Sequence, residues 1–574
     1  MAKPPWDRRL YGVVLGIVLA LGVSALIAGP LGWDEETDYI GLRGQLGHAL
    51  QLLRGGHPDY HAIHANLEYY GTVGLLPAWV LWFLQQGLVT GSFSLDRALF
   101  DPGVEHQLTG FFTVSHGVLL LELVLLSRVV VAIARRLSLR QPWLAGAVVL
   151  VTPSLLGHAF VNSKDGPFAL FYSLYSLGLI LRLREPLAGL SPRRPGRAAL
   201  IALLGATLMV NQKMAALVPV LLSEGVLALL RCWSPAPPDA PGGLEAAAAA
   251  WRRRAAVILP VLALPLLALA GALLLQPAAW GVPPQRFVAE AVQTFALHSW
   301  GGCMWFAGRC VGVRDPSWSA AAYMLHWLPA KLPLLLLVLP LLQGLAWLRQ
   351  AMRRTRSPGH LGRATDPAAV LLLLQLLLLP GLAALRNANL YDADRHLLFV
   401  VPPLAVLAVM GFERLQELPA AFPAWRGPRP WALALVALLA VGLLLDDLLL
   451  HPYQLAYFNE IGRHSLSHRN TSVEYWSVSA KEAVQQALLR ERLPLNPTVA
   501  DSLTTLPLFI GLRQLGGRVA AGASTELVFQ VRNPPDFQTP PPADRICARP
   551  IEVKRRQLFA PELLMSRLFV CRKA

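Results

Sequence analysis

Residues 368–385 read AAVLLLLQLLLLPGLAAL and contain no charged side chain. A helix of about 20 apolar residues is long enough to cross the hydrocarbon core of a bilayer. Similar runs occur at 332–345 and 431–445. In lipid, backbone polar groups must be satisfied within the segment itself, which favours helices. We therefore predict a polytopic α-helical membrane protein.

The composition of the 574-residue chain supports this prediction. Apolar residues make up 54% and charged residues 15%, whereas soluble proteins carry about 25% charged residues. This balance excludes a disordered chain and argues against a soluble enzyme. The net charge of +16 could indicate nucleic-acid binding. However, the basic residues gather in short loops between apolar runs, so we expect membrane lipids and no nucleic acid as partners.

Eleven segments have the length and composition of membrane spans. Lys and Arg concentrate in alternate loops, which places the N-terminus in the cytoplasm. After an odd number of spans, the C-terminus is then extracytoplasmic. The bias towards Arg, Ala, Leu and Pro indicates a bacterial inner membrane. The predicted spans are 10–31, 109–134, 142–160, 167–182, 199–212, 214–230, 256–276, 321–347, 368–385, 396–412 and 431–449.

These spans define a transmembrane domain over 1–449, with large extracytoplasmic loops at 32–108 and 277–320, and an extracytoplasmic domain over 450–574. An apolar piece at 71–89 would reverse the topology if it crossed the membrane, so we interpret it as a re-entrant or interfacial helix. The C-terminal domain contains short alternating segments that predict a small α/β fold. They lie at 498–503, 519–521, 527–531 and 567–571.

Two cysteines, Cys303 and Cys310, share the second large loop. They form a disulfide if the loop is extracytoplasmic and are otherwise free thiols. Spacing alone leaves both readings open.

The acidic pair Asp34-Glu35 directly follows the first span. Partial burial beside the bilayer is expected to raise the pKa of a carboxylate, which suits it to accept a proton from a hydroxyl or an amine. The alternative is an interfacial pair that only ends a helix. Few ionisable residues lie in mid-span, among them Glu122, Arg128 and Glu224, although a transporter would be expected to carry them there.

Two further polar segments flank predicted spans. In Asn162-Ser163-Lys164-Asp165-Gly166-Pro167, Lys164 could hold a phosphate while Asp165 orients a hydroxyl or a second charge. The alternative is an ordinary turn built from turn-forming residues. In 386–396, RNANLYDADRH, two Arg on the side where Arg is scarce indicate an anionic partner such as a lipid phosphate. The alternative is a surface pair between Asp394 and Arg395.

A set of four residues has the spacing of a metal site. His57, His61, His64 and Glu68 follow one another at intervals of 4, 3 and 4. On a helix this spacing places all four on one face. Pro58 disfavours a helix there, so we predict no metal. Aromatic residues at Tyr323, and at Tyr453 beside His451, either stack on sugar rings or anchor the chain at the membrane interface.

Taken in order, these segments resemble the GT-C glycosyltransferases, in the branch of the protein O-mannosyltransferases and the aminoarabinose lipid A transferases. The resemblance covers most of residues 10–485. It departs from the family at Asn211-Gln212-Lys213, where Arg is often found. The matching segments are Asp34-Glu35, Glu68-Tyr69-Tyr70-Gly71, 162–168, Arg395-His396, 451–459 and 474–483.

The resemblance implies a sugar donor on a polyprenyl phosphate, an extracytoplasmic acceptor and inversion at the anomeric carbon, without a cofactor. Asp34 would be the general base, and Glu35 and Asp165 would position substrates. Lys164, Arg395 and His396 would bind the phosphate. Contacts to acceptor or sugar are expected from Tyr69, Tyr70, Tyr323, His451 and Tyr453. The alternatives are a lipid or glycolipid transporter or flippase, and a scaffold of this shape without activity.

Overall fold

The computed structural model describes most of the chain, and the statements below concern that part. It describes residues 5–101, 108–185, 196–232, 244–297, 303–306, 308–312, 315–356, 366–421, 428–491, 494–499, 508, 511–512, 515–518, 520, 522, 524–531, 537–541 and 543–573.

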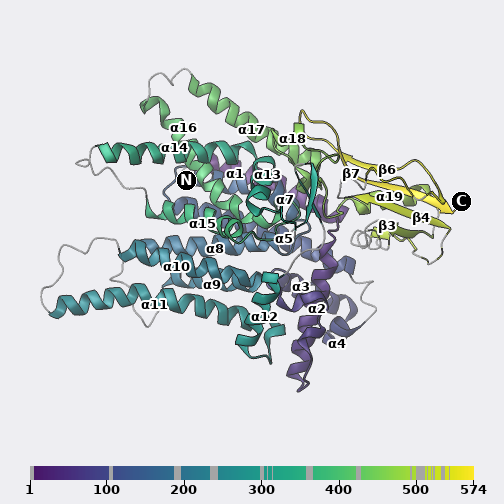
Figure 1. Cartoon of the computed structure of the whole chain (residues 1–574), viewed down its shortest axis with the longest axis horizontal. Coiled ribbons are helices and arrows are strands. Elements are labelled where there is room, and N and C mark those ends of the chain that lie inside the picture. Colours follow the sequence, from purple (N-terminus) through teal and green to yellow (C-terminus); the bar gives the residue numbers. More distant parts are fainter. Residues whose placement is uncertain are drawn as a thin grey trace.

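Long helices lie alongside one another, and a small sheet lies at one end of them (Figure 1). The helices of this bundle are α1 Trp6–Ala28, α5 Leu108–Arg136, α6 Pro142–Leu150, α7 Pro153–His158, α8 Asp165–Arg184, α9 Arg197–Gln212, α10 Leu217–Cys232, α11 Leu244–Leu274, α14 Leu334–Arg356, α15 Pro367–Leu385, α16 Val401–Ala421 and α17 Pro428–Leu450. Among the described helices, eight are long and apolar enough to cross a membrane. The predicted class of polytopic helical membrane protein with a small C-terminal α/β domain is confirmed.

All eleven predicted spans coincide with helices, although two of them are broken. The segment 142–160 divides into α6 and α7 before Pro153, and 321–347 divides into α13 Ala320–Lys331 and α14 before Pro333. Proline disfavours helical backbone in the residue before it, which explains both breaks. The helix α9 and the apolar part of α11, Val261–Leu274, are shorter than the eight candidate spans, so the count of eleven stays a prediction.

Basic side chains at the ends of α8 and α10 contact neighbouring connections of the bundle. Arg231 of α10 donates to the carbonyl of Glu185 after α8. Arg184 of α8 pairs with Asp366, which caps α15. These contacts bring together the basic connection after α8, the end of α10 and the start of α15. Which end faces the cytoplasm stays a prediction.

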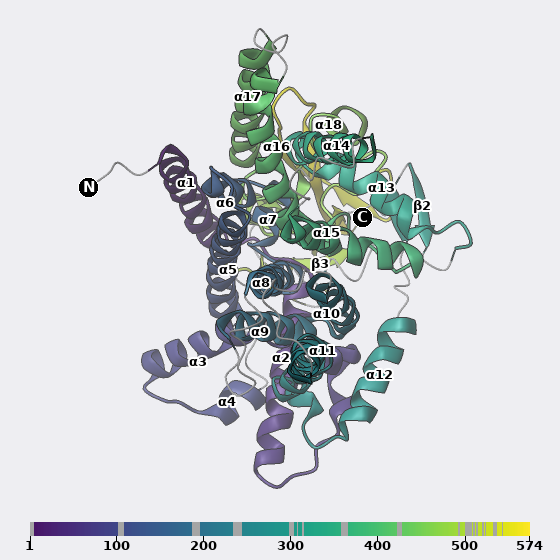
Figure 2. The same cartoon turned by 90° about the vertical axis from the view of Figure 1, so that its left-hand side faces the viewer.

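The first large loop folds into short helices on one side of the bundle (Figure 2). These are α2 Asp34–Leu53, the 3-10 turns η1 Tyr60–Ala62 and η2 His64–Tyr69, α3 Leu76–Thr90 and α4 Leu95–Phe100. The 15 residues of α3 rise about 22 Å, less than the roughly 30 Å of a hydrocarbon core. Leu84 and Leu88 of α3 remain exposed. These features fit the predicted interfacial helix.

The second large loop contains α12 Pro284–Leu297 and a hairpin of β1 Cys303–Phe306 with β2 Arg309–Gly312. The hairpin was not predicted. Cys310 of β2 is disulfide-bonded, and Cys303 lies on the paired strand.

The C-terminal sheet is mixed and is built around its longest strand, β7 Leu563–Lys573. The strand β7 runs antiparallel to β4 Thr525–Val531, β5 Arg545–Cys547 and β6 Ile551–Arg555, and β3 Asn496–Val499 runs parallel to β4. Helix α19 Ala480–Arg490 packs on β6 and β7. A disulfide that sequence reasoning missed, Cys547–Cys571, joins β5 to β7.

The strands predicted at 527–531 and 567–571 lie within β4 and β7, and 498–499 belong to β3. Residues 500–503 and most of 519–521 lie outside the described residues. Between α17 and α19, the stretches 453–459 and 473–480 are buried where the bundle meets the sheet. They contain η9 Gln454–Ala456 and flank α18 Gly462–Ser465.

Candidate functional site

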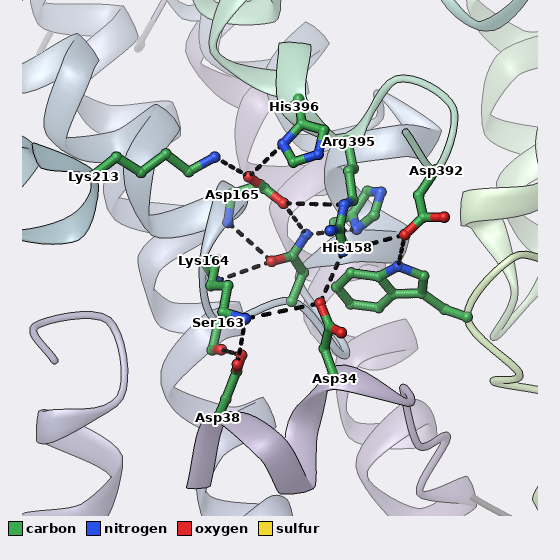
Figure 3. Close-up of polar contacts among 12 residues, drawn as sticks. Asp34, Asp38, His158, Ser163, Lys164, Asp165, Lys213, Asp392, Arg395 and His396 are labelled. Carbon is green, nitrogen blue, oxygen red and sulfur yellow. Dashed lines mark hydrogen bonds and ion pairs between the residues drawn. The ribbon is translucent and has the colours of Figure 1, made fainter. Parts of the chain in front are cut away.

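Seven ionisable side chains from four parts of the chain point towards one another (Figure 3). Three of the segments begin a helix: α2 at Asp34, α8 at Asp165 and the 3-10 turn η7 Arg395–Val400 ahead of α16. Carboxylates are favoured in the first turn of a helix because the unpaired backbone N–H groups there are partly positive. We call this set the charge cluster: Asp34, Asp38, Lys164, Asp165, Lys213, Arg395 and His396.

Asp34 lies between two cations. Its Oδ2 accepts a hydrogen bond from Arg395 Nη1 at 2.9 Å and is 3.9 Å from Lys164 Nζ. Burial alone would raise the pKa of Asp34, but the two cations outweigh it and lower the pKa below its usual value. The expected upward shift was therefore wrong in direction, because the sequence did not show how close the cations lie. Asp34 is ionised at neutral pH. Its position at the start of α2 also excludes the alternative of a pair that ends a helix.

One turn further along α2, Asp38 shares Lys164 with Asp34. Lys164 Nζ is 2.5 Å from Asp38 Oδ1, and Ser163 Oγ donates to Asp38 Oδ2. Burial raises the pKa of Asp38 to about 6, and the nearby Asp34 adds to this shift while Lys164 opposes it. Burial would lower the pKa of Lys164, but the two carboxylates raise it well above its usual value.

Asp165 organises the opposite side of the charge cluster. Its Oδ1 is 2.5 Å from Lys213 Nζ, and its Oδ2 accepts from Asn162 Nδ2 at 2.9 Å. Asn162 Oδ1 in turn accepts from the backbone N–H groups of Lys164 and Asp165, both at 2.9 Å. The segment 162–167 is thus a turn that starts α8, and it also presents charged side chains. The interpretation as a turn and the interpretation as a charged site are therefore compatible.

Arg395 is buried, with 4% of its side chain exposed, so the alternative of a surface pair with Asp394 is wrong. Its ionic partners are Asp34, Asp392 with Oδ2 at 3.5 Å from Nη1, and Asp165 with Oδ2 at 4.0 Å from Nε. Asp394 accepts a hydrogen bond from Ser154 instead. The guanidinium of Arg395 also lies over the ring of Tyr391, 4.6 Å from the centroid.

Two lysines and a histidine form the accessible edge of the charge cluster. Side-chain exposure is 30% for Lys213, 21% for Lys164 and 19% for His396. His396 Nδ1 is 3.8 Å from Asp165 Oδ1. Within the described residues, His396 Nε2 has no hydrogen-bond partner. An anionic ligand that approaches from this edge would meet three nitrogen-bearing side chains first.

A pocket adjoins the charge cluster beneath Lys164. It lies between α2, the chain that follows η2, and the turn before α8. Both apolar and polar side chains line it. The lining residues are Asp38, Gly41, Leu42, Gln45, Leu67, Tyr70, Gly71, Thr72, Leu75, Ser163, Lys164 and Gln212.

Glu35, the second member of the acidic pair, points away from the charge cluster. Its carboxylate accepts from the Gly32 N–H and contacts His116 Nε2 of α5, both at 2.6 Å. Burial raises the pKa of Glu35 although His116 opposes the shift. These contacts fix the start of α2 against α5.

Among the five residues predicted to contact acceptor or sugar, Tyr70 lies at the charge cluster, with its ring centroid 4.7 Å from Lys164 Nζ. Tyr69 donates to Glu290 of α12 at 3.2 Å. Tyr323 is buried in the core beside Trp318 and Trp327.

His451 and Tyr453 lie where the bundle meets the C-terminal domain. Tyr453 donates to Glu482 of α19 at 2.7 Å, and the Arg555 guanidinium of β6 lies over its ring. His451 Nδ1 is 3.1 Å from Gln454 Nε2. These contacts hold the segment that follows α17 against α19 and β6.

The four-residue metal pattern does not form one helical face. The 3-10 turns η1 and η2 are separated by the extended residue Ile63, so the premise of a continuous helix was wrong. His61 Nδ1 lies 3.7 Å from Glu68 Oε1, and His64 has its side chain outside the described part. Among the described side chains, no group of three or more His, Cys, Asp or Glu could hold a metal ion.

Sequence reasoning missed Asp38, Lys213 and the residues that surround Arg395. Asp38 follows Asp34 by four residues, a spacing that places both on one helix face and could have revealed it. Lys213 lies between the predicted spans 199–212 and 214–230, at a departure from the family pattern that predicts no role for it. Asp392 lies three residues before Arg395, within the segment 386–396, so this spacing could have revealed it. Trp476 joins the site through a tertiary contact that leaves no local pattern.

Comparisons with known proteins find similarity to solved structures. No family model matches the sequence, and no curated protein matches it. Among solved structures, the chain is similar to ArnT from Cupriavidus metallidurans bound to undecaprenyl phosphate. The sequence identity is 14%, the match covers 97% of each chain, and the TM-score is 0.45.

Proposed function

We propose that this protein is a membrane glycosyltransferase that moves a sugar from a polyprenyl-phosphate donor to an extracytoplasmic acceptor. The observation that carries the proposal is the position of the ionised Asp34 between Lys164 and Arg395, at the end of a membrane bundle. A carboxylate that can accept a proton lies there beside cations that can hold a phosphate.

In the proposed reaction, the acceptor hydroxyl or amine attacks the anomeric carbon and transfers its proton to Asp34. The bond between that carbon and the phosphate oxygen breaks on the opposite side of the sugar. The electron pair leaves with the polyprenyl phosphate. One displacement of this kind inverts the configuration of the anomeric carbon.

The cations would stabilise charge that develops on the departing phosphate. Arg395 donates a hydrogen bond to Asp34, and Lys164 lies 3.9 Å from the same carboxylate. Lys213 is the lysine of the accessible edge, where the neighbouring His396 offers a further nitrogen to the phosphate. Fixed cations directed at a leaving group are worth several kcal/mol of barrier, on the order of 3 for a single donor. A leaving group that is already anionic can be stabilised in this way, so we propose that the reaction uses no metal cofactor.

Each of these cations is paired with a carboxylate of the protein: Lys213 with Asp165, Lys164 with Asp38, and Arg395 with Asp34 and Asp392. A donor phosphate therefore competes with carboxylates for the same cations. When the phosphate engages Lys164 and Arg395, Asp34 loses part of the attraction that lowers its pKa. Donor binding would thereby make Asp34 a stronger base at the moment when one is needed.

The transporter or flippase alternative relies on charges inside the bundle. Glu224 of α10 is 2.5 Å from Arg182 of α8, and both side chains are almost fully buried. Tyr175 also donates to Glu224. This arrangement is that of a closed structural ion pair, so it gives no support to a path through the bundle.

The test is transfer of label by the full chain in nanodiscs. Radiolabelled polyprenyl-phosphate sugars are supplied with and without cell-envelope extract, and the Asp34→Asn variant is assayed in parallel. Release or transfer of sugar by the wild type alone supports the proposal, and the labelled product identifies the acceptor. Absence of turnover with every donor, together with flipping of a fluorescent lipid, would favour the transporter alternative instead.

A further inference from the structure

The C-terminal domain reaches the charge cluster through one short segment. Residues 474–479, which we call the strap, run from the buried Glu474 to Ser479 at the start of α19, and all six are buried. We propose that the strap positions Asp34, Arg395 and Asp165 for reaction, and that Trp476 is its principal positioning residue. This inference rests on the proposed function and adds a requirement for the C-terminal domain.

Trp476 contacts Arg395 and one of the carboxylates paired with it. Its ring centroid is 5.0 Å from the Arg395 guanidinium carbon, a distance at which a cation is attracted to an aromatic face. Its Nε1 donates to Asp392 Oδ2 at 3.3 Å, and the same oxygen is 3.5 Å from Arg395 Nη1. One side chain thus fixes both the arginine and the carboxylate that pairs with it.

The backbone of Trp476 also fixes the entry to α2. Its carbonyl accepts a hydrogen bond from the N–H of Trp33, the residue before Asp34, at 3.1 Å. At Gly32 an added Cβ would lie 2.9 Å from the Trp476 ring, closer than side chains tolerate. The approach of Trp476 therefore sets where the helix that carries Asp34 begins.

Tyr475 reaches the other side of the charge cluster through a chain of hydrogen bonds. Its hydroxyl is 2.9 Å from His158 Nε2, His158 Nδ1 is 3.0 Å from Asn162 Nδ2, and Asn162 Nδ2 donates to Asp165 Oδ2 at 2.9 Å. Because Asn162 donates to Nδ1, the proton of a neutral His158 lies on Nε2 and is given to Tyr475. Asp165 is thus held in place from the strap.

The strap is fixed to the C-terminal sheet. The Glu474 carboxylate accepts from the N–H groups of Trp476 and Val478 and from Ser479 Oγ, all at 3.0 Å. Ser479 Oγ is 2.8 Å from Ser566 Oγ of β7. The backbone of Ser477 has φ 57°, which turns the strap back towards the sheet. Movement of the sheet would therefore be transmitted to Asp34, Arg395 and Asp165.

The test compares Trp476→Phe and Trp476→Leu with Trp82→Phe, a control at an equally buried tryptophan of the first-loop core. The full chain in nanodiscs is assayed for kcat, for the KM of the donor and for the pH profile of kcat, at a fixed interval below the melting temperature of each variant. Phenylalanine keeps an aromatic face but loses the bond to Asp392, so we expect kcat to fall about fivefold. With leucine, which keeps neither contact, we expect a fall of at least thirtyfold.

The pH profile separates positioning from a merely structural role. When Arg395 is held less firmly, it stabilises the Asp34 carboxylate less, so the acid limb of the Trp476→Leu profile should move to higher pH. A loss of kcat with an unmoved acid limb, or equal losses in all three variants, would overturn the role of the strap. If the wild type shows no turnover with any donor, the proposed function fails and the catalytic role of the strap fails with it. Wild-type turnover with unaffected variants overturns the strap alone.

Discussion

The substitution Asp34→Asn removes the proposed base and leaves the rest of the charge cluster in place. Asparagine has nearly the same shape as aspartate and can still accept a hydrogen bond from Arg395 Nη1. It cannot take a proton from the acceptor. We therefore expect this variant to bind the donor and to fail at transfer.

The expected magnitude follows from the contacts that remain. A positioned general base contributes about 10² to 10⁴ in rate, which corresponds to about 3 to 5 kcal/mol of barrier. Arg395 keeps Asp392 at 3.5 Å, and Lys164 keeps Asp38 at 2.5 Å, so neither buried cation loses its last counterion. The expected change in unfolding free energy is therefore small, within about 1 kcal/mol, because a cation left without a partner is what makes such substitutions costly.

The assay measures kcat for labelled sugar transfer, binding of the donor, and the melting temperature of the same samples. Asp96→Asn is the matched control, since Asp96 lies in the same loop in an exposed pair with Arg54. The reasoning is refuted if Asp34→Asn keeps more than a tenth of wild-type kcat. It is also refuted if activity is lost together with donor binding and the melting transition, because the defect would then be one of folding.

Four further outcomes are expected. Lys213→Met should weaken binding of bare polyprenyl phosphate at least tenfold, and Lys213→Arg should retain it, as measured by equilibrium binding in nanodiscs. Equal affinities of Lys213→Met and the wild type would show that Lys213 does not bind the phosphate. The pKa of Asp38 is raised from 3.8 to about 6, so its stabilising contribution is complete below about pH 4 and is lost as the pH rises through 6. Asp38→Asn should abolish that decline, which amounts to at most about 3 kcal/mol, in unfolding curves recorded in detergent from pH 4 to 8. Glu224→Gln leaves Arg182 buried without its charge partner and should destabilise the bundle by about 3 to 5 kcal/mol, which a lower melting temperature would show. The double variant with Arg182→Leu should recover most of the lost stability. A chelator should leave transfer unchanged, and inhibition that a divalent ion reverses would contradict the metal-free proposal.

The sequence predicted the helices well because apolar runs of spanning length have few alternatives in a bilayer. It predicted the breaks less well. The residues on both sides of Pro153 and of Pro333 are apolar, so hydropathy predicted one continuous span in each place. The structure has two helices there, divided at the proline. The two C-terminal disulfide partners, Cys547 and Cys571, were missed because only the strand register places them opposite each other.

In the site, too, local sequence motifs predicted the residues but not their tertiary contacts. Asp34, Lys164, Asp165, Arg395 and His396 were identified from short motifs beside spans, and the structure brings them together. What the motifs could not supply was the partner of each group. The wrong direction of the Asp34 pKa shift came from this gap. A carboxylate in isolation is penalised by burial, whereas one held by two cations is stabilised in its charged form.

The strap has a consequence for how the protein is made. Asp34 and Arg395 are separated by 361 residues, and the strap is fixed to the sheet by Ser566, 87 residues beyond Ser479. Because synthesis runs from the N-terminus, the proposed base Asp34 is made early. The strap and the strand that holds it are made late. A nascent chain that already carries Asp34, Lys164 and Arg395 would still lack the geometry for transfer until the final strand emerges and pairs. Ribosome stalling within the last hundred residues should consequently leave a protein that is inserted in the membrane but unable to consume donor lipid.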